Sequence, residues 1–457
     1  MRIMALTPRE QETISSICDT LIPSLPSEPN DSPDTRAFYS RAASDIGVDK
    51  ALAQIIDETL EPGRREEFRR LLSTMDSRFL NLFLSGRPSK YLELGNEEKE
   101  RYLASWRDSR IGSKRSGFQA LKRLACFLAY TLVNERGSNP NWKEIGYPGP
   151  SVSRSIGEST EIPISQMETP ENGAATECDV VIVGSGAGGS VVAYELSKRK
   201  RNVIVVESGP HSTAKNFDQK ELSMMNRLFE QHGAAATKDL SIALLAGIGS
   251  GGGTTVNWMT CIRPPASVLR NWELEFGIGG LTGGDFKAVV EEVWSTLKVN
   301  RVQSQLNYNN EALFDGCRAL GYNEGTDYEI ISRNAVGCRE RCAFCTFGCV
   351  YSCKQSTMMN YLPMAYKNGA RFIFDAKVER VIVDGGIAKG VSVRATRDSK
   401  PVEFQIKARI VVLACGSIRT PALLLNSGIR GKNIGRHLRL HPTTAVSGFF
   451  DNKDVRA

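Results

Sequence analysis

Long apolar runs are missing from this chain of 457 residues. No stretch reaches the roughly 18 uncharged apolar residues that a membrane-spanning helix needs. The nearest one, Leu124 to Val133, is too short, follows Lys122 and Arg123 directly, and fits a core helix better than an interfacial one. The opening residues MRIMALTPREQET also lack the apolar stretch of a signal peptide, so we expect an intracellular protein that is not secreted.

A strong excess of one charge is lacking too. The net charge of +7 is modest for this length, and Lys and Arg are spread along the chain except at Lys198 to Arg201. That run follows a predicted helix, whose C-terminal dipole favours cations. We therefore predict no nucleic-acid partner. The apolar share of 41% is ordinary for a globular protein, and the length suits two or three domains.

Cysteine, in contrast, is plentiful, and five of the eleven cysteines lie close together. Thiolates at this density suit an iron–sulfur cluster or a zinc site. The spacing is not that of ferredoxins, however, and a redox disulfide or simply buried thiols would also fit. Without a signal peptide, a disulfide scaffold is the weaker explanation. The candidate metal ligands are Cys338, Cys342, Cys345, Cys349 and Cys353.

The chain changes character twice along its length. Residues 1–140 predict an all-helical region, with a first helix over 7–22 that Thr7, Pro8 and Glu10 would cap, and further helical patterns around 50–84 and 116–133. Residues 141–177 predict a linker or a long surface arm, because most of this stretch is rich in Pro, Ser, Gly, Thr and Glu and has no apolar periodicity. From residue 178 onward, strand and helix patterns mix.

A dinucleotide-binding fingerprint opens this mixed region. Val180 to Val183 is a wholly apolar, β-branched run, typical of a central parallel strand. Gly184, Gly186 and Gly189 follow as G-x-G-x-x-G, just before a predicted helix. The three glycines allow a tight turn, a close approach of the backbone to a pyrophosphate, and close packing of helix on strand. The free N–H groups of the helix N-terminus favour the phosphates.

An acidic residue completes the fingerprint. The next predicted strand, Val203 to Val206, ends at Glu207, which lies 23 residues after Gly184. A carboxylate at this position binds a ribose hydroxyl. It favours FAD or NAD over NADP, but the fingerprint alone does not choose between FAD and NAD.

A second glycine-rich segment follows at residues 246–258, AGIGSGGGTTVNW. Five glycines fall between Gly247 and Gly253, so this segment cannot be the interior of a stable helix or strand. It would let the main chain lie close to a flat ligand. A flexible surface loop is the alternative, but the apolar run Ile242 to Ala246 before it, and Val256 and Trp258 after it, favour a buried loop.

At this point the chain resembles the glucose–methanol–choline (GMC) family of FAD oxidoreductases. Gly252, Gly253, Thr254, Thr255 and Asn257 match the family's glycine-rich loop against the flavin and pyrophosphate. The family's G-S-[IV]-x-T-P signature matches residues 416–421. Residues 370–393 add two predicted strands around Gly385 and Gly386. The fingerprint and the resemblance together predict these FAD-binding residues, with Val378 contacting the adenine through its backbone: Gly184, Gly186, Ala187, Gly188, Gly189, Glu207, Gly252, Gly253, Thr254, Asn257, Val378 and Gly416.

Within the family, the long-chain fatty alcohol oxidase branch is the most similar. The opening helical region resembles that branch's N-terminal extension, itself similar to small subunits of membrane-bound gluconate dehydrogenases, and the stretches 118–150 and 338–357 are typical of the branch. The resemblance implies oxidation of a long-chain primary alcohol to the aldehyde, with hydride passing to FAD and molecular oxygen as acceptor, giving hydrogen peroxide. It also implies association with a membrane surface. A quinone- or cytochrome-linked dehydrogenase and an inactive FAD-binding fragment are the alternatives.

Such a reaction needs a base, and the chain has only four histidines. We expect His437 and His441 to be packed or hydrogen-bonded, and His211 and His232 to be solvated. In the resembled family a C-terminal segment supplies the catalytic histidine, so we expect the catalytic residues to lie beyond Ala457. The predicted fold class is α/β: a Rossmann-like FAD-binding domain built from two separated segments, with part of a substrate domain, preceded by the helical region.

Overall fold

The computed structural model divides the chain into two compact units. The first comprises Met1–Ser151, Lys220–Leu222 and Ala234–Leu245, and the second comprises the rest. The structure describes residues 5–58, 60, 62–85, 88–150, 164–238, 242–304, 306–326, 328–338, 342, 344–440 and 448.

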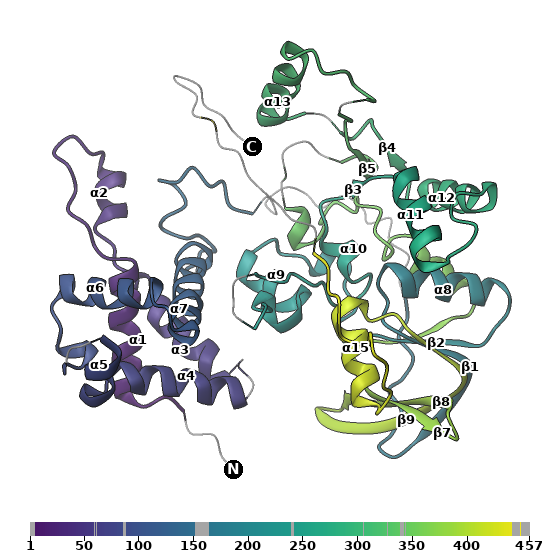
Figure 1. Ribbon diagram of the computed structural model, residues 1–457, viewed down its shortest axis with the longest axis horizontal. Coiled ribbons are helices and arrows are strands. Elements are labelled where there is room, and N and C mark those ends of the chain that lie inside the picture. Colours follow the sequence, from purple (N-terminus) through teal and green to yellow (C-terminus); the bar gives the residue numbers. More distant parts are fainter. Residues whose placement is uncertain are drawn as a thin grey trace. The chain divides into compact units, whose positions relative to one another are not determined.

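The first unit is built on helices, as predicted. Every secondary-structure element that the structure describes between residues 5 and 150 is a helix (Figure 1). One core of apolar side chains joins α1, α3, α4, α6 and α7. Trp106, Tyr91 and Leu52 are among its fully buried side chains. The α-helices are α1 Pro8–Leu21, α2 Pro33–Tyr39, α3 Val48–Glu58, α4 Pro62–Met75, α5 Arg78–Ser85, α6 Asn96–Arg107 and α7 Gly112–Thr131.

Helix α1 begins where the sequence indicates. Thr7 is extended, its hydroxyl accepts from the Glu10 N–H at 3.2 Å, and the Glu10 carboxylate accepts from the Thr7 N–H at 2.7 Å. This reciprocal pair satisfies two of the N–H groups that a helix start leaves without partners. The predicted capping box is therefore confirmed.

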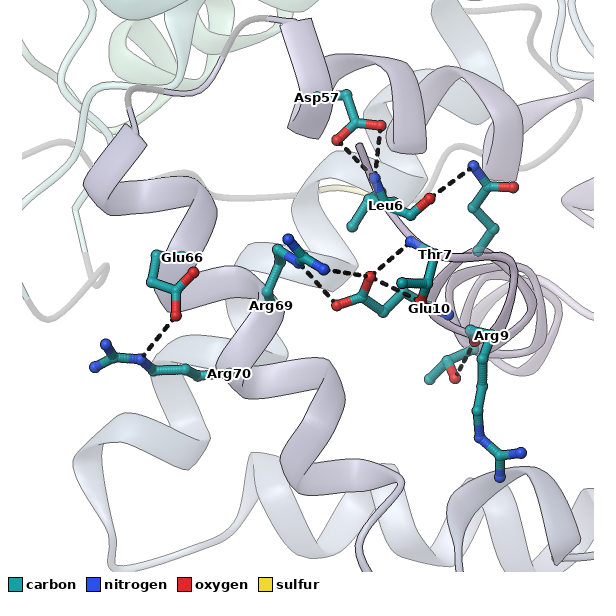
Figure 2. A network of polar contacts seen from close by, with 10 residues as sticks. Leu6, Thr7, Arg9, Glu10, Asp57, Glu66, Arg69 and Arg70 are labelled. Atoms are coloured by element: carbon teal, nitrogen blue, oxygen red, sulfur yellow. Dashed lines mark hydrogen bonds and ion pairs between the residues drawn. The ribbon is translucent and has the colours of Figure 1, made fainter. Parts of the chain in front are cut away.

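Glu10 has a second role that the sequence pattern does not reveal (Figure 2). Its carboxylate also accepts from the Arg69 guanidinium of α4, at 2.9 and 3.2 Å. Burial opposes ionisation of Glu10, but the hydrogen bonds from Arg69 and Thr7 outweigh it and hold the pKa of this carboxyl below its usual 4.5. One side chain thus caps α1 and joins it to α4.

Arg69→Ala should lower the unfolding free energy of the helical unit by about 1–2 kcal/mol at pH 7, because a partly buried charge-assisted pair is lost. A carboxyl whose folded pKa is depressed contributes stability above its unfolded pKa and loses it as pH falls through the folded pKa. The loss of unfolding free energy caused by Arg69→Ala should therefore be smaller at pH 3 than at pH 7. Urea denaturation of wild type and variant at the two pH values measures this loss. Arg70→Ala, which removes an exposed pair with Glu66, is the control and should cost below about 0.5 kcal/mol. Equal losses for the two variants would contradict the buried link.

The second unit is organised around a six-stranded sheet with the order β6-β2-β1-β9-β8-β7. Strands β6, β2, β1 and β9 run parallel, and β9, β8 and β7 form an antiparallel meander. The strands are β1 Ala175–Val183, β2 Val203–Val206, β6 Arg371–Ile373, β7 Ala376–Asp384, β8 Ile387–Arg397 and β9 Lys400–Leu413. The sheet therefore combines two separated segments of sequence, as predicted for a Rossmann-like domain.

Successive side chains of β1 point to opposite faces of the sheet, and each face is covered by other elements. Val180 and Ile182 of β1 pack with α8 Ala187–Lys198 and α14 Tyr361–Lys367 on one face. Val181 and Val183 pack on the other face with the meander and with α15 Gly416–Asn426, which lies beside the meander in Figure 1. Successive side chains of a strand point to opposite faces, so an unbroken apolar run is what a strand covered on both sides requires.

Both strand patterns predicted after residue 370 are confirmed. Strands β7 and β8 pair antiparallel around Gly385 and Gly386, which have φ of 56° and 79°. Such left-handed pairs suit the two-residue turns of hairpins. Strand β9, in which buried and exposed residues alternate over most of its length, then leads into α15 at Gly416.

The predicted linker, 141–177, is divided between the two units. Asn141 and Trp142 are buried in the helical unit, where they donate to the carbonyl oxygens of Ala129 and Tyr130. Residues 164–174 lie along the sheet, and the Met167 N–H donates to the Phe372 oxygen at 2.9 Å. Residues 151–163 lie outside the described residues.

Other elements follow between β2 and β6. A small antiparallel sheet has the order β3-β5-β4. Its strands and the neighbouring helices are α9 Glu221–Leu228, α10 Gly253–Val256, β3 Thr260–Cys261, α11 Ala266–Phe276, α12 Gly284–Thr296, β4 Val299–Asn300, α13 Tyr308–Ala319 and β5 Ser332–Asn334. No helix in the described part of the chain is long and apolar enough to cross a bilayer.

Candidate dinucleotide-binding site

Three parallel strands end together and form the base of the site. The Gly184 N–H donates to the Val206 oxygen at 2.8 Å, and the Ala414 N–H donates to the Val183 oxygen at 2.8 Å. These bonds bring together the chain after β1, β2 and β9. The helix that follows β1, α8, covers one face of the sheet, and the helix that follows β9, α15, covers the other. Open α/β sheets bind ligands at such a switch point.

The first glycine turn is fixed by close packing. A Cβ on Gly189 would lie 2.0 Å from the Gly184 oxygen, and one on Gly184, which has φ of 101°, would lie 2.5 Å from the Ala414 oxygen. The direction of a Cβ on Gly186, in contrast, meets no atom within 4 Å. Gly186 is the N-cap of α8 and makes no side-chain cap, which leaves the first N–H groups of this helix available to an anion.

Glu207 joins three loops at the bottom of the site. It is 6% exposed, and one carboxylate oxygen accepts from the N–H and hydroxyl of Ser185, at 2.9 and 2.8 Å. The other accepts from the N–H groups of Gly209 and Gly249, at 3.0 and 3.2 Å, and from the Ser208 hydroxyl at 3.3 Å. The sequence predicts Glu207 as a ribose ligand, which stays a prediction. The five protein donors give it a structural role that sequence reasoning missed.

The second glycine loop lies against the first. Gly252 has φ of 50°, and a Cβ there would lie 3.1 Å from the Gly186 Cα. Two loops more than 60 positions apart in the sequence therefore form one glycine-lined surface. Ser250, Thr255 and Val256 are buried, as expected for this loop, but Trp258 is 71% exposed and donates its indole N–H to the Thr346 hydroxyl. The prediction that Trp258 helps to bury the loop is wrong.

The predicted cofactor-binding residues fall into two groups. Most gather at this surface: Gly184, Gly186, Ala187, Gly188 and Gly189 around the start of α8, Gly252, Gly253, Thr254 and Asn257 on and after the second loop, Glu207 beneath both, and Gly416 after β9. Val378 lies elsewhere, inside β7, where its side chain is buried against the core of the sheet. Its predicted backbone contact with the adenine stays a prediction.

Lys354 supports the second loop from below, a role that the sequence pattern does not reveal. Its side chain is 2% exposed, and the ammonium donates to the carbonyl oxygens of Thr255 at 2.8 Å, Asn257 at 2.5 Å and Cys345 at 2.7 Å. Burial lowers the pKa of Lys354 to about 8, against the opposing effect of nearby cysteine sulfurs. The Thr254 hydroxyl adds a bond to the Thr357 hydroxyl at 3.0 Å.

The five clustered cysteines lie next to Lys354 in two groups, Cys342 with Cys345 and Cys353 with Cys338 and Cys349. Hydrogen bonding between Cys342 and Cys345 lowers the pKa of Cys342 and raises that of Cys345. Hydrogen bonding with Cys353 lowers the pKa of Cys338 and of Cys349 and raises that of Cys353. All eleven cysteines are free thiols.

This pairing does not support the predicted metal site. Among the residues that the structure describes, no three Cys, His, Asp or Glu side chains are placed to hold one metal ion. The thiols satisfy one another in hydrogen-bonded groups instead of converging on a common centre. An iron–sulfur or zinc site at Cys338, Cys342, Cys345, Cys349 and Cys353 is therefore not supported.

The histidines differ in part from expectation. His211 is half-buried and its ring stacks on Phe374 at 4.8 Å between centroids, so it is not the solvated side chain predicted. Burial lowers the pKa of His211. His232 is exposed, as expected, whereas His437 is exposed and not packed. His441 lies outside the described residues.

Fold and site together define a Rossmann-like dinucleotide-binding protein, and residues 182–236 match the family model of NAD(P)-binding Rossmann-like domains. Residues 225–443 match the model described as GMC oxidoreductase, so the chain carries a GMC oxidoreductase domain, as its motifs predicted. Residues 8–149, the helical region, match the model described as gluconate 2-dehydrogenase subunit 3.

Relatives agree with this family. The chain is 28% identical to the long-chain-alcohol oxidase FAO3 of Arabidopsis thaliana over 98% of its own length and 67% of the relative's. A GMC-type oxidoreductase of Mycobacterium tuberculosis is 36% identical, over 61% of this chain and 44% of that protein. The chain thus spans about two thirds of the length of the plant oxidases. Among solved structures, formate oxidase aligns over 57% of this chain and 48% of its own, with 18% identity and a TM-score of 0.41.

Proposed function

We propose that this protein is an FAD-dependent oxidase of long-chain primary alcohols, producing the aldehyde and, with molecular oxygen as acceptor, hydrogen peroxide. The main support for the proposal is that the two glycine loops lie against each other where β1, β2 and β9 end, in a chain with a GMC oxidoreductase domain. The substrate and the acceptor rest on similarity to the plant long-chain-alcohol oxidases.

The residues present fit FAD. The uncapped N-terminus of α8 and the open side of Gly186 would hold the diphosphate, since both free N–H groups and the helix dipole favour negative charge there. Gly252 and Gly253 would let the main chain lie against the flat ring system, because neither places a side chain in the way. A carboxylate at Glu207, rather than a cation, favours a ribose without a 2′-phosphate.

FAD, when bound, supplies a hydride acceptor for the alcohol carbon. The chain's own contribution, in the described part, is to position and to shield. Glu207 holds Ser185, Gly209 and Gly249 in one arrangement, and Lys354 fixes the carbonyl groups of Thr255 and Asn257. A base must still take the hydroxyl proton. Its predicted place in a C-terminal segment follows from the resemblance alone and stays a prediction.

Turnover tests the proposal. The protein expressed from its own gene, loaded with FAD, should convert dodecanol or hexadecanol to the aldehyde and release hydrogen peroxide in equal amounts. Aldehyde formed only when a quinone or cytochrome is added, without peroxide, would replace the oxidase with the dehydrogenase alternative. Bound FAD without aldehyde under either condition would leave an inactive FAD-binding protein and overturn the proposal.

A further inference from the structure

His211 lies at the end of the sheet where the adenine of a bound dinucleotide belongs. In a Rossmann-like domain the pyrophosphate lies at the start of the first helix, and the acidic residue after the second strand binds the adenosine ribose. Strand β6 pairs parallel with β2 on the side away from β1, so the adenine beyond this ribose would lie over the carboxyl ends of β2 and β6. The His211 ring stacks at 4.8 Å between centroids, with 22° between the ring planes, on Phe374, which directly follows β6.

The segment that carries His211 is fixed on both sides of this residue. The Ser250 N–H donates to the Pro210 oxygen at 3.1 Å, and the Ser212 N–H donates to the Ser250 hydroxyl at 3.0 Å. The Asp375 N–H, two positions after β6, donates at 3.0 Å to the carbonyl oxygen two residues before His211. The histidine is therefore tied both to the second glycine loop and to the connection between β6 and β7, which gives its ring a set position at the site.

Neither ring nitrogen of His211 has a hydrogen-bond partner within the described part of the chain. Nδ1 is enclosed and makes no hydrogen bond, and Nε2, which is not enclosed, makes none either. Burial lowers the pKa of His211 below its usual 6.5, so the ring is neutral at pH 7 and carries a single proton. The proton is favoured on Nε2, because only this nitrogen can reach an acceptor outside the protein.

Packing alone does not explain a histidine at this position. Enclosing a ring nitrogen without a hydrogen bond opposes folding, and a purely apolar ring on Phe374 would avoid that loss. A half-buried histidine with an open, unpartnered Nε2–H instead suits an acceptor on a ligand.

We propose that His211 binds the adenine of FAD, with its Nε2–H donating to a ring nitrogen of the base and Phe374 packed against one face of the imidazole. Adenine suits this contact, because it has unprotonated ring nitrogens that accept hydrogen bonds. The contact would make the site select FAD over flavin mononucleotide (FMN), which lacks the adenosine. The proposal rests on FAD as the cofactor of the function proposed above.

Separate titration with the two halves of the cofactor tests the proposal. Flavin-free protein is titrated with FAD, with ADP and with FMN. His211→Phe keeps an aromatic ring on Phe374 but offers no nitrogen, so its Kd for FAD and for ADP should rise about 5-fold through the loss of one hydrogen bond. His211→Ala loses the ring as well, and the same two Kd values should rise about 10-fold or more. The Kd for FMN should not change in either variant, because FMN carries no adenine.

His232→Ala is the control. His232 is exposed, and its Nδ1 already lies 3.2 Å from the Asn226 oxygen, so all three Kd values should match those of wild type. A footprint of the wild-type protein needs no variant and decides the question if a substitution prevents folding. Diethyl pyrocarbonate should modify His211, ADP should slow this reaction, and FMN should not. His232 should react equally fast with and without ADP, as read by peptide mass spectrometry.

Three results would overturn the proposal: unchanged Kd values for FAD and ADP in both His211 variants, a rise in the Kd for FMN by the same factor as for FAD, or a His211 footprint that ADP leaves unchanged. In each of these the wild-type protein still binds FAD, so the proposed function would stand. A wild-type protein that binds no FAD at all would refute the proposed function together with this inference.

Discussion

Glu207→Ala should lower the unfolding free energy of the second unit by about 3–5 kcal/mol and reduce FAD retention at least about 10-fold. The variant leaves the N–H groups of Ser185, Gly209 and Gly249 without their acceptor in a buried site, and each such group costs about 1–3 kcal/mol. The loops that would hold the diphosphate then lose their common anchor. Chemical denaturation and the flavin bound after gel filtration measure the two effects.

Two control variants separate this anchor from a general effect of charge. Glu403→Ala removes an exposed carboxylate on β9 and should change stability by less than about 0.5 kcal/mol. Glu207→Gln keeps the shape but replaces one acceptor oxygen with a donor, so it should fall between wild type and Glu207→Ala. A Glu207→Ala protein as stable as wild type, with its flavin retained, would show that the carboxylate does not hold the loops.

Lys354→Met should also lower the unfolding free energy of the second unit by about 3–5 kcal/mol, although Lys354 belongs to no cofactor motif. The methionine keeps the length and apolar character of the stem but leaves three carbonyl groups without their donor. Thr255 and Asn257 lie just after the glycines of the second loop, so the variant should also bind FAD more weakly. Thermal melts with and without added FAD would show a lower Tm and a smaller stabilisation by FAD.

The matched control is Lys367→Met, at the exposed C-terminal end of α14. It removes the same charge and adds the same side chain, but no buried carbonyl group loses a donor, so its Tm should stay near that of wild type. Equal melting temperatures for the two lysine variants would contradict the supporting role of Lys354.

Local patterns predicted much of the fold. The capping residues of α1, the apolar run of β1 with its glycine turn, and the Gly385–Gly386 hairpin each depend on neighbours in sequence, and each is confirmed. Gly184, Gly189 and Gly252 stand where backbones approach closely, so only glycine is accommodated there, and the sequence pattern pointed to all three.

Long-range contacts could not be predicted in this way. Arg69 reaches Glu10 across 59 positions, and Lys354 reaches Thr255 across 99, with no periodicity to mark either pair. Trp258 is apolar next to a buried loop yet exposed, because its neighbours in space, not in sequence, decide its burial. The cysteine spacing indicated a dense thiol cluster but left its chemistry open, since spacing alone does not show which sulfur atoms meet.

The most direct test of the central claim is the flavin content of the purified protein. We predict a flavin absorbance spectrum and, after denaturation, release of FAD at close to one molecule per chain, identified by chromatography against FAD, FMN and NAD standards. Protein that carries no flavin, takes up none when incubated with FAD, and instead binds NAD would contradict the account.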